Sequence, residues 1–145
     1  VAELARPGES YLELGCGTGL LSLTAAIHDA SSCLATDVSE MALEFTAAAA
    51  ADQKLKNVQT MVFDVFADAP LPVADVLILS DVFVTEQLAV AHAQRVVEAC
   101  KRGFRQVFVV DPGRSTRQTF LDTLSSGKLA NEGFMDAEGC LAGAR

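Results

Sequence analysis

Three glycines at alternate positions follow a short apolar segment near the start of the chain. The segment at 11–14 is followed by Gly15, Gly17 and Gly19, and Glu13 lies two residues before the first of them. Glycine allows unusual backbone angles and a close approach of a ligand to the main chain. A pyrophosphate favours helix-end amides without a neighbouring anion. Because a carboxylate precedes this loop, and because its spacing is not the Gly-x-Gly-x-x-Gly of dinucleotide folds, we predict a cationic ligand.

Four acidic side chains lie on or directly after four predicted strands. Glu13 is on the first strand, Asp37 ends the second, and Asp64 and Asp81 follow the third and fourth. The carboxyl ends of parallel strands meet at one edge of the sheet, where ligands bind in open α/β folds. Polar residues commonly end strands, so one such acid would mean little. Four successive acids beside a glycine loop favour a shared ligand site.

The position of each acid indicates the part of a nucleoside ligand that it would bind. Asp37 lies 22 residues after Gly15, where a carboxylate accepts both hydroxyl protons of a ribose diol; the alternative is a helix cap. Asp64 would accept the exocyclic amine of an adenine, with the amide of Val65 on a ring nitrogen, or would be a solvated turn residue. Glu13 would hold the glycine loop and a cationic amino-acid end of the ligand, or would only pin the loop amides.

The segments that carry these residues alternate between strand and helix patterns. We predict strands over Ser10–Leu14, Cys33–Asp37, Val58–Phe63, Val76–Leu79 and Gln106–Val110, and helices over Thr18–Asp29, Ser39–Lys54, Thr85–Lys101 and Ser115–Leu124. Ser39 and Thr85 are predicted N-caps, and Ser115 to Gln118 form a capping-box pattern. This order predicts a doubly wound, Rossmann-like α/β fold with a mostly parallel sheet and helices on both faces.

Length and composition are those of one globular domain, residues 1–145. Half of the 145 residues are hydrophobic, and no apolar run approaches the length of a membrane span. The chain begins at Val1 rather than Met, from which we expect a trimmed sequence. No pair among the four cysteines has zinc or redox spacing, so we expect no metal site and reduced structural thiols in an intracellular, cytoplasmic or mitochondrial protein. His28 and His92 are expected to be structural.

The net charge of −8 is unevenly distributed. Acidic residues dominate the first 90 positions, whereas a basic group lies in the second half, at Arg95, Lys101, Arg102, Arg105, Arg114 and Arg117. A nucleic-acid footprint would be more basic and would include interleaved aromatic residues. We therefore interpret the basic group as a solvated helix face, and docking of an acidic partner stays open.

The motifs together resemble a known family. The run Glu13 to Gly19, with Asp37 and Asp64, is similar to the motifs of the class I (seven-strand) S-adenosylmethionine-dependent methyltransferases. Ser80-Asp81-Val82-Phe83 and Asp111-Pro112-Gly113-Arg114 resemble the branch that holds the electron transfer flavoprotein beta-subunit lysine methyltransferase and its bacterial, ribosomal-protein methyltransferase-like relatives. The resemblance covers roughly residues 8–122.

The resemblance implies roles for individual residues. S-adenosyl-L-methionine would be bound by Glu13, Gly15, Cys16, Gly17, Thr18, Gly19, Asp37, Val38, Asp64, Val65 and Ser80. Asp81 would be catalytic, facing the methyl group and the incoming lysine amine; the alternative is a helix N-cap. The lysine-modifying relatives have an aromatic residue three positions after this acid, where this chain has Val84. The family also closes its sheet with an antiparallel hairpin, for which residues 127–145 show little strand pattern.

Three hypotheses follow for the function. The first is an active methyltransferase that acts on a lysine of a protein substrate by in-line displacement, with a small-molecule N-methyltransferase as a variant. The second is a non-catalytic S-adenosylmethionine-binding scaffold, motivated by Val84 and the short C-terminal part. The third is a nicotinamide-dependent dehydrogenase, which the glycine spacing disfavours. A membrane or nucleic-acid partner is not expected, and the oligomeric state is left open.

Overall fold

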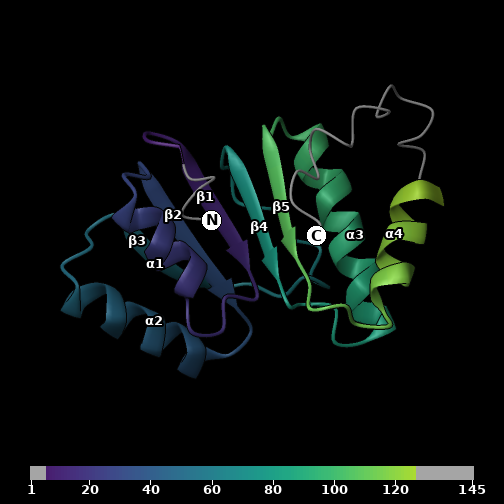
Figure 1. Cartoon of the computed structure of the whole chain (residues 1–145), viewed down its shortest axis with the longest axis horizontal. Helices are drawn as coiled ribbons and strands as arrows, with labels where there is room; N and C mark the ends of the chain where they lie inside the picture. Colours follow the sequence, from purple (N-terminus) through teal and green to yellow (C-terminus); the bar gives the residue numbers. More distant parts are fainter. Residues whose placement is uncertain (1–5, 127–145) are drawn as a thin grey trace.

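The computed structural model describes residues 6–126, which form a five-stranded sheet with four helices (Figure 1). The strands are β1 (Ser10–Leu14), β2 (Ser32–Asp37), β3 (Val58–Val62), β4 (Val76–Ser80) and β5 (Gln106–Val110). The helices are α1 (Leu20–Ile27), α2 (Glu40–Asp52), α3 (Glu86–Lys101) and α4 (Arg117–Ser126). The strand order is β3-β2-β1-β4-β5, and every neighbouring pair is parallel.

The order of the strands places a switch point at the centre of the sheet. β1 pairs with β2 on one side and with β4 on the other, so the chain winds outward first in one direction and then in the other. All five strands point the same way, and their carboxyl ends form a single edge (Figure 1). This topology confirms the predicted doubly wound α/β fold, and its switch point lies where the glycine loop leaves β1.

Side chains that alternate along the strands fill two separate cores. On one face Leu12, Leu14, Leu77 and Leu79 pack against α3 and against Phe120 of α4. On the other face Tyr11, Cys33 and Ile78 pack against Ala25 and Ala26 of α1, and Leu43 of α2 packs against Ala35 of β2. Burial of one such leucine contributes about 1.5–3 kcal/mol, so apolar residues on both faces hold the sheet edge that carries the acids.

Every predicted strand and helix is present, and each predicted end lies within two residues of the observed one. The hydroxyl of Ser39 accepts a hydrogen bond from the backbone amide of Ala42, and the hydroxyl of Thr85 accepts one from the backbone amide of Leu88. Both residues are therefore N-caps, as predicted. The first helix begins at Leu20 rather than at Thr18, because Gly19 is the left-handed residue that precedes it, with φ 71°. The capping box before α4 is not formed.

The residues of the predicted capping box make other contacts. The hydroxyl of Thr116 donates to the carbonyl of Phe83, and the side-chain Nε2 of Gln118 donates to Oδ1 of Asp122 at 2.8 Å. The Thr116 contact reaches across 33 residues of sequence and ties the start of α4 to the segment after β4. Tertiary contacts of this kind outweigh a local capping signal.

Within residues 6–126 no helix is long and apolar enough to cross a membrane, and no cluster of metal-ligating side chains is present. Cys16 and Cys33 are buried thiols, and burial raises their pKa values to about 11 and about 12. Such thiols are inert at neutral pH, as expected for structural cysteines. Residues 127–145, where the family's hairpin would fall and where the sequence shows little strand pattern, lie outside the described residues.

Candidate functional site

The glycine loop between β1 and α1 is tightly constrained. Gly15, Gly17 and Gly19 have φ values of 69°, 53° and 71°. A methyl group at Gly19 would overlap the side chain of Thr46 on α2, so this glycine allows α1 and α2 to approach each other closely. A methyl group at Gly17 would meet nothing within 4 Å. Gly17 therefore presents its backbone to the open side of the loop, where a ligand can reach it.

The backbone of Cys16 connects the glycine loop to β2. Its amide donates to the carbonyl of Thr36 at 2.8 Å, and its own carbonyl accepts from the amide of Gly19 at 2.8 Å. Its side chain is buried against Ala35 and Leu43. The predicted contact of Cys16 with a cofactor can therefore involve only its backbone, whereas the neighbouring Thr18 is exposed.

Glu13 is buried on β1, with 2% of its surface exposed. Its Oε2 accepts hydrogen bonds from the amide and the hydroxyl of Ser22 in α1, at 3.0 and 2.5 Å. Burial raises the pKa of Glu13 to about 7, although the Ser22 hydrogen bonds act in the opposite direction and Asp37 raises it further. The expectation that Glu13 holds the loop amides needs correction, because the carboxyl group instead holds the first turn of α1.

Asp37, at the end of β2, joins two elements of the site. Its Oδ2 accepts from the amide of Gly17 at 2.9 Å, and its Oδ1 accepts from the amide of Ser39 at 2.9 Å. A carboxylate offers about four acceptor positions, so both oxygens keep capacity for a diol. The two earlier interpretations of Asp37 are thus compatible: it supports the start of α2 and still faces the loop. Val38, 65% exposed, follows it at the open edge.

Asp64, two residues beyond the end of β3, forms a tight turn. Its Oδ1 accepts from the amide of Phe66 at 2.9 Å, and its carbonyl accepts from the amide of Ala67 at 3.0 Å. Asp64 is exposed and Val65 is half-buried. The turn orients the Asp64 carboxylate at the same sheet edge as Asp37, because β2 and β3 are neighbours in parallel register.

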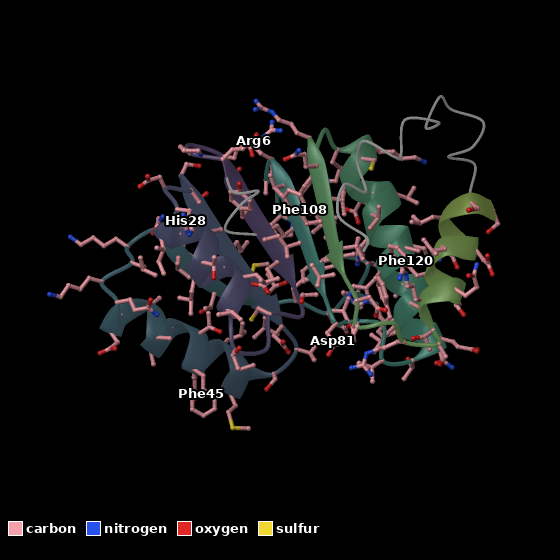
Figure 2. The ribbon with its side chains drawn as sticks, in the orientation of Figure 1. Arg6, His28, Phe45, Asp81, Phe108 and Phe120 are labelled. Atoms are coloured by element: carbon pink, nitrogen blue, oxygen red, sulfur yellow. The ribbon has the colours of Figure 1, made fainter. Side chains whose placement is uncertain are left out.

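Asp81 follows Ser80 at the end of β4, at the carboxyl edge of the sheet (Figure 2). Its φ is 56°, an uncommon left-handed conformation for a residue with a side chain. Its Oδ1 accepts from Nε of Arg114 at 2.5 Å, and this hydrogen bond holds the pKa of Asp81 below its usual range. The helix-cap interpretation is wrong, because Thr85 caps α3.

Arg114 is a site residue that the sequence analysis did not select as one. It belongs to the turn after β5, where Oδ1 of Asp111 accepts from the amides of Gly113 and Arg114 at 2.8 and 2.9 Å. The other oxygen, Oδ2 of Asp111, is buried and makes no hydrogen bond within the described residues. The available signal was the Asp-Pro-Gly-Arg turn directly after the strand that adjoins β4.

The aromatic residue near Asp81 belongs to the core. Phe83 is 1% exposed and stacks on Phe120 of α4 with ring centroids 4.3 Å apart. It also meets the ring of His92 edge-on at 6.1 Å. Val84 is 58% exposed. Phe83 therefore does not take the place of the aromatic residue found three positions after the acid in the lysine-modifying relatives.

The predicted solvated basic face is wrong for its first member. Arg95 is only 9% exposed and lies against the segment after β3. Three other members are ion-paired: Arg102 with Glu98, Arg105 with Glu9 and Asp75, and Arg114 with Asp81. Four of the six basic residues therefore make contacts with other residues of the same chain.

A comparison with protein families identifies the chain. Residues 1–105 match the family described as "Ribosomal protein L11 methyltransferase (PrmA)". The chain belongs to this methyltransferase family. The match includes the glycine loop together with Asp37, Asp64 and Asp81. It confirms the assignment to the class I methyltransferases that the motifs predicted. No curated protein matches the chain.

Solved structures share the fold of this L11 methyltransferase family member. A putative RNA methyltransferase from Pyrococcus horikoshii gives a TM-score of 0.63 at 18% identity, over 82% of this chain and 56% of that one. The [4+2]-cyclase SpnF gives 0.60 at 17%, over 82% and 51%. Coclaurine N-methyltransferase bound to N-methylheliamine and SAH gives 0.54 at 23%, over 68% and 31%. The chain thus spans between about a third and just over half of these proteins.

Proposed function

We propose that this chain is the S-adenosylmethionine-binding part of a methyltransferase that modifies a lysine amine of a protein. The observation that carries the proposal is the connection from the glycine loop through Asp37 to the start of α2, located at the switch point of the sheet. Family membership supports methyl transfer, whereas fold alone would not, since the [4+2]-cyclase shares it.

The residues present fit the cofactor. The exposed backbone at Gly17 accommodates the methionine portion, the remaining acceptor positions of Asp37 suit a ribose diol, and Val38 offers an apolar surface for a base. Asp64 and Val65 supply an acceptor and an amide at the next strand end. The sulfonium of S-adenosylmethionine supplies an activated methyl group, so the protein contributes positioning and exclusion of water.

Asp81 is the proposed catalytic residue. Its hydrogen bond to Arg114 demonstrates that this carboxylate can bind a nitrogen cation in the present geometry. A substrate amine would replace the guanidinium there and be oriented by Oδ1. The lysine reaches Asp81 as an ammonium ion and would lose one proton to water before transfer, which leaves a neutral amine held by Oδ1. S-adenosylmethionine, when bound, would supply the methyl group and would leave as S-adenosylhomocysteine. The Arg114 hydrogen bond lowers the pKa of Asp81, so the carboxylate is ionised when the substrate arrives and can accept a hydrogen bond from it.

Two observations support a protein lysine as the methyl acceptor. The chain belongs to the L11 methyltransferase family, and its motifs at Ser80 to Phe83 and at Asp111 to Arg114 resemble those of lysine-modifying relatives. A second candidate is methylation of a small amine, which the exposed Val84 favours because it leaves the position of the lysine-contacting aromatic unfilled. Coclaurine N-methyltransferase, which shares the fold, was solved bound to N-methylheliamine and SAH.

Isothermal titration calorimetry with S-adenosylhomocysteine tests the cofactor site, with Asp37→Ala as the control variant and NAD as the control ligand. We expect micromolar binding of S-adenosylhomocysteine to the wild type and none of NAD. Equal affinity of wild type and Asp37→Ala would refute the site.

Transfer from methyl-labelled cofactor to a cell extract tests the substrate. We expect label in protein and recovery of methyl-lysine after hydrolysis. Label confined to small molecules would favour the second candidate. Binding without any transfer would identify a non-catalytic scaffold.

A further inference from the structure

The connection between β3 and β4 has no helix or strand of its own, yet it carries two residues of the proposed cofactor site. It runs from Phe63 to Asp75, and Asp64 and Val65 are at its start. Connections of this length are uncommon in compact domains unless they serve a function. Its stretch from 66 to 70 is exposed, so apolar burial does not fix its conformation.

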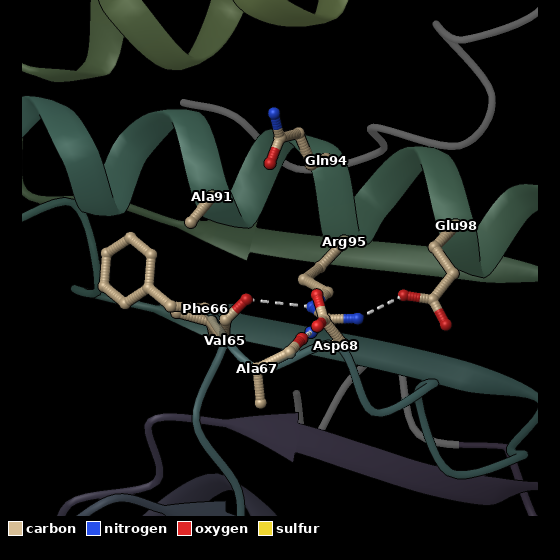
Figure 3. Close-up of a pocket in the computed structure, with 8 residues that line it drawn as sticks. All are labelled: Val65, Phe66, Ala67, Asp68, Ala91, Gln94, Arg95 and Glu98. Atoms are coloured by element: carbon tan, nitrogen blue, oxygen red, sulfur yellow. Dashed lines mark hydrogen bonds and ion pairs between the residues drawn. The ribbon is translucent and has the colours of Figure 1, made fainter.

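Arg95 of α3 binds this connection along its backbone (Figure 3). Its Nε donates to the carbonyl of Val65 at 3.0 Å, its Nη1 to that of Ala69 at 3.1 Å, and its Nη2 to that of Ala67. These carbonyls come from every second residue, which matches the planar fork of a guanidinium. The guanidinium carbon also lies 5.2 Å from the centre of the Phe63 ring, within cation–π range.

Glu98, one turn further along α3, completes the arrangement. Its Oε2 accepts from Nη1 of Arg95 at 2.5 Å, and its Oε1 accepts from the amide of Leu71 at 2.7 Å. Leu71 is 1% exposed, so the connection is held at this end by the core as well. The pair therefore reaches the connection at four places between residues 65 and 71.

A hollow lies beside Arg95 and Glu98, so few other side chains support the connection there. A hollow of about 330 Å³ separates α3 from the connection and is lined by Phe66, Asp68 and Gln94 in addition to the two charged residues. Figure 3 shows Arg95 reaching toward the backbone of Val65 and Ala67 beside this hollow. Phe63 and Val65 pack in or against the core on either side of Asp64, whereas the exposed stretch from 66 to 70 is held by the polar contacts of Arg95.

We propose that Arg95 is a positioning residue that sets the Asp64–Val65 turn and thereby the recognition of the adenine base. The inference rests on the proposed function. The chain of contacts is short: Arg95 fixes the carbonyls of Val65 and Ala67, and the amides of Phe66 and Ala67 bind Asp64. The position of the Asp64 carboxylate follows from that of the backbone on either side. A lysine has a single ammonium nitrogen on a flexible stem, so it does not reproduce the planar fork in which three separate nitrogens each donate to a different carbonyl.

The test compares two ligands that differ only in the base. S-adenosylhomocysteine carries an exocyclic amine that donates to Asp64, and S-inosylhomocysteine has an oxygen there. We expect the wild type to bind S-adenosylhomocysteine about tenfold or more tightly than S-inosylhomocysteine. The loss of a hydrogen bond to a charged group weakens binding by about this factor. Arg95→Met, of similar length, should bind S-adenosylhomocysteine about tenfold more weakly and should discriminate by less than about threefold.

Matched variants separate positioning from general loss of structure. Arg102→Met removes an arginine at the end of the same helix that contacts Glu98 but not the connection, and it should keep the preference. Arg95→Lys retains the charge and should still lose most of the preference. Should Arg95→Met fail to fold, Arg95→Lys provides the same readout.

Each outcome has a definite meaning. If either Arg95 variant binds both ligands more weakly by the same factor, its role is merely structural and the inference is overturned. If the wild type binds S-adenosylhomocysteine without preference for the base, the recognition by Asp64 is wrong. If the wild type binds neither ligand, the proposed function itself fails and the inference falls with it.

Discussion

Glu13 offers a sharp test because its carboxyl group is buried and titrates near neutrality. Replacement by glutamine keeps a carbonyl oxygen for the amide and hydroxyl of Ser22 and removes the titration. The wild-type pKa rises from 4.5 to about 7 on folding, so the folded chain binds this proton more tightly than the unfolded chain. The stabilisation from Glu13 is therefore full below pH 4.5 and is lost as the pH rises through 7.

The size of the effect follows from the same change. A rise from 4.5 to about 7, at about 1.4 kcal/mol per pH unit, corresponds to about 3 kcal/mol between the protonated and the ionised state. We expect Glu13→Gln to have a free energy of unfolding about 2–3 kcal/mol above wild type at pH 8 and close to wild type at pH 5.

Urea denaturation at pH values from 5 to 8 measures this difference directly. Glu44→Gln is the control, because it makes the same chemical change at an exposed position of α2 and should leave the pH dependence unaltered. A lower free energy of unfolding for Glu13→Gln than for wild type at pH 8 would refute the reasoning. The same conclusion would follow if both variants altered the pH dependence equally.

Three further predictions concern the loop and the strand ends. Gly19→Ala should destabilise the fold by about 2–4 kcal/mol, from its positive φ and the overlap with Thr46, whereas Gly17→Ala should cost only about 1–2 kcal/mol; thermal unfolding of the two compares them. Asp37→Asn should weaken S-adenosylhomocysteine binding by about tenfold or more in calorimetry, with equal affinity contradicting the ribose role. Asp81→Asn should lower the rate of methyl transfer by about 100-fold at unchanged cofactor affinity; an unchanged rate would exclude a catalytic role.

The alternation of strands and helices was readable from the sequence because each element buries one consistent face. Val76 to Leu79 of the central strand β4 form a continuous apolar run that is buried, as expected for a sheet covered on both sides. The caps at Ser39 and Thr85 were equally predictable, since a cap depends on residues within one turn. The start of α1 was misplaced because the glycine loop continues through Gly19.

Residues whose role depends on a distant partner were the ones that sequence patterns missed. Arg95 and Glu98 have the spacing of an exposed helical ion pair, and nothing local indicates that backbone carbonyls 26–30 residues earlier will bury the arginine. Glu13 was correctly placed on the first strand, but its partner Ser22 depends on how α1 leaves the loop. The partners are backbone carbonyls in the case of Arg95 and a serine in the case of Glu13, and neither kind of group forms a recognisable sequence motif.

The three best-defined contacts of the candidate site share one feature: a charged side chain of one element holds the segment that follows a strand of the sheet. Asp37 of β2 holds the loop after β1, and Arg95 of α3 holds the connection after β3. Arg114, after β5, holds the acid after β4. Each contact crosses between neighbours in the sheet or between sheet and helix, so the open edge is organised before any ligand arrives. The first two contacts involve backbone groups, which a ligand does not need to displace, whereas the third occupies the carboxylate proposed for catalysis. A site built in this way would bind its cofactor with little rearrangement and would require the substrate's own cation to compete with Arg114 for Asp81.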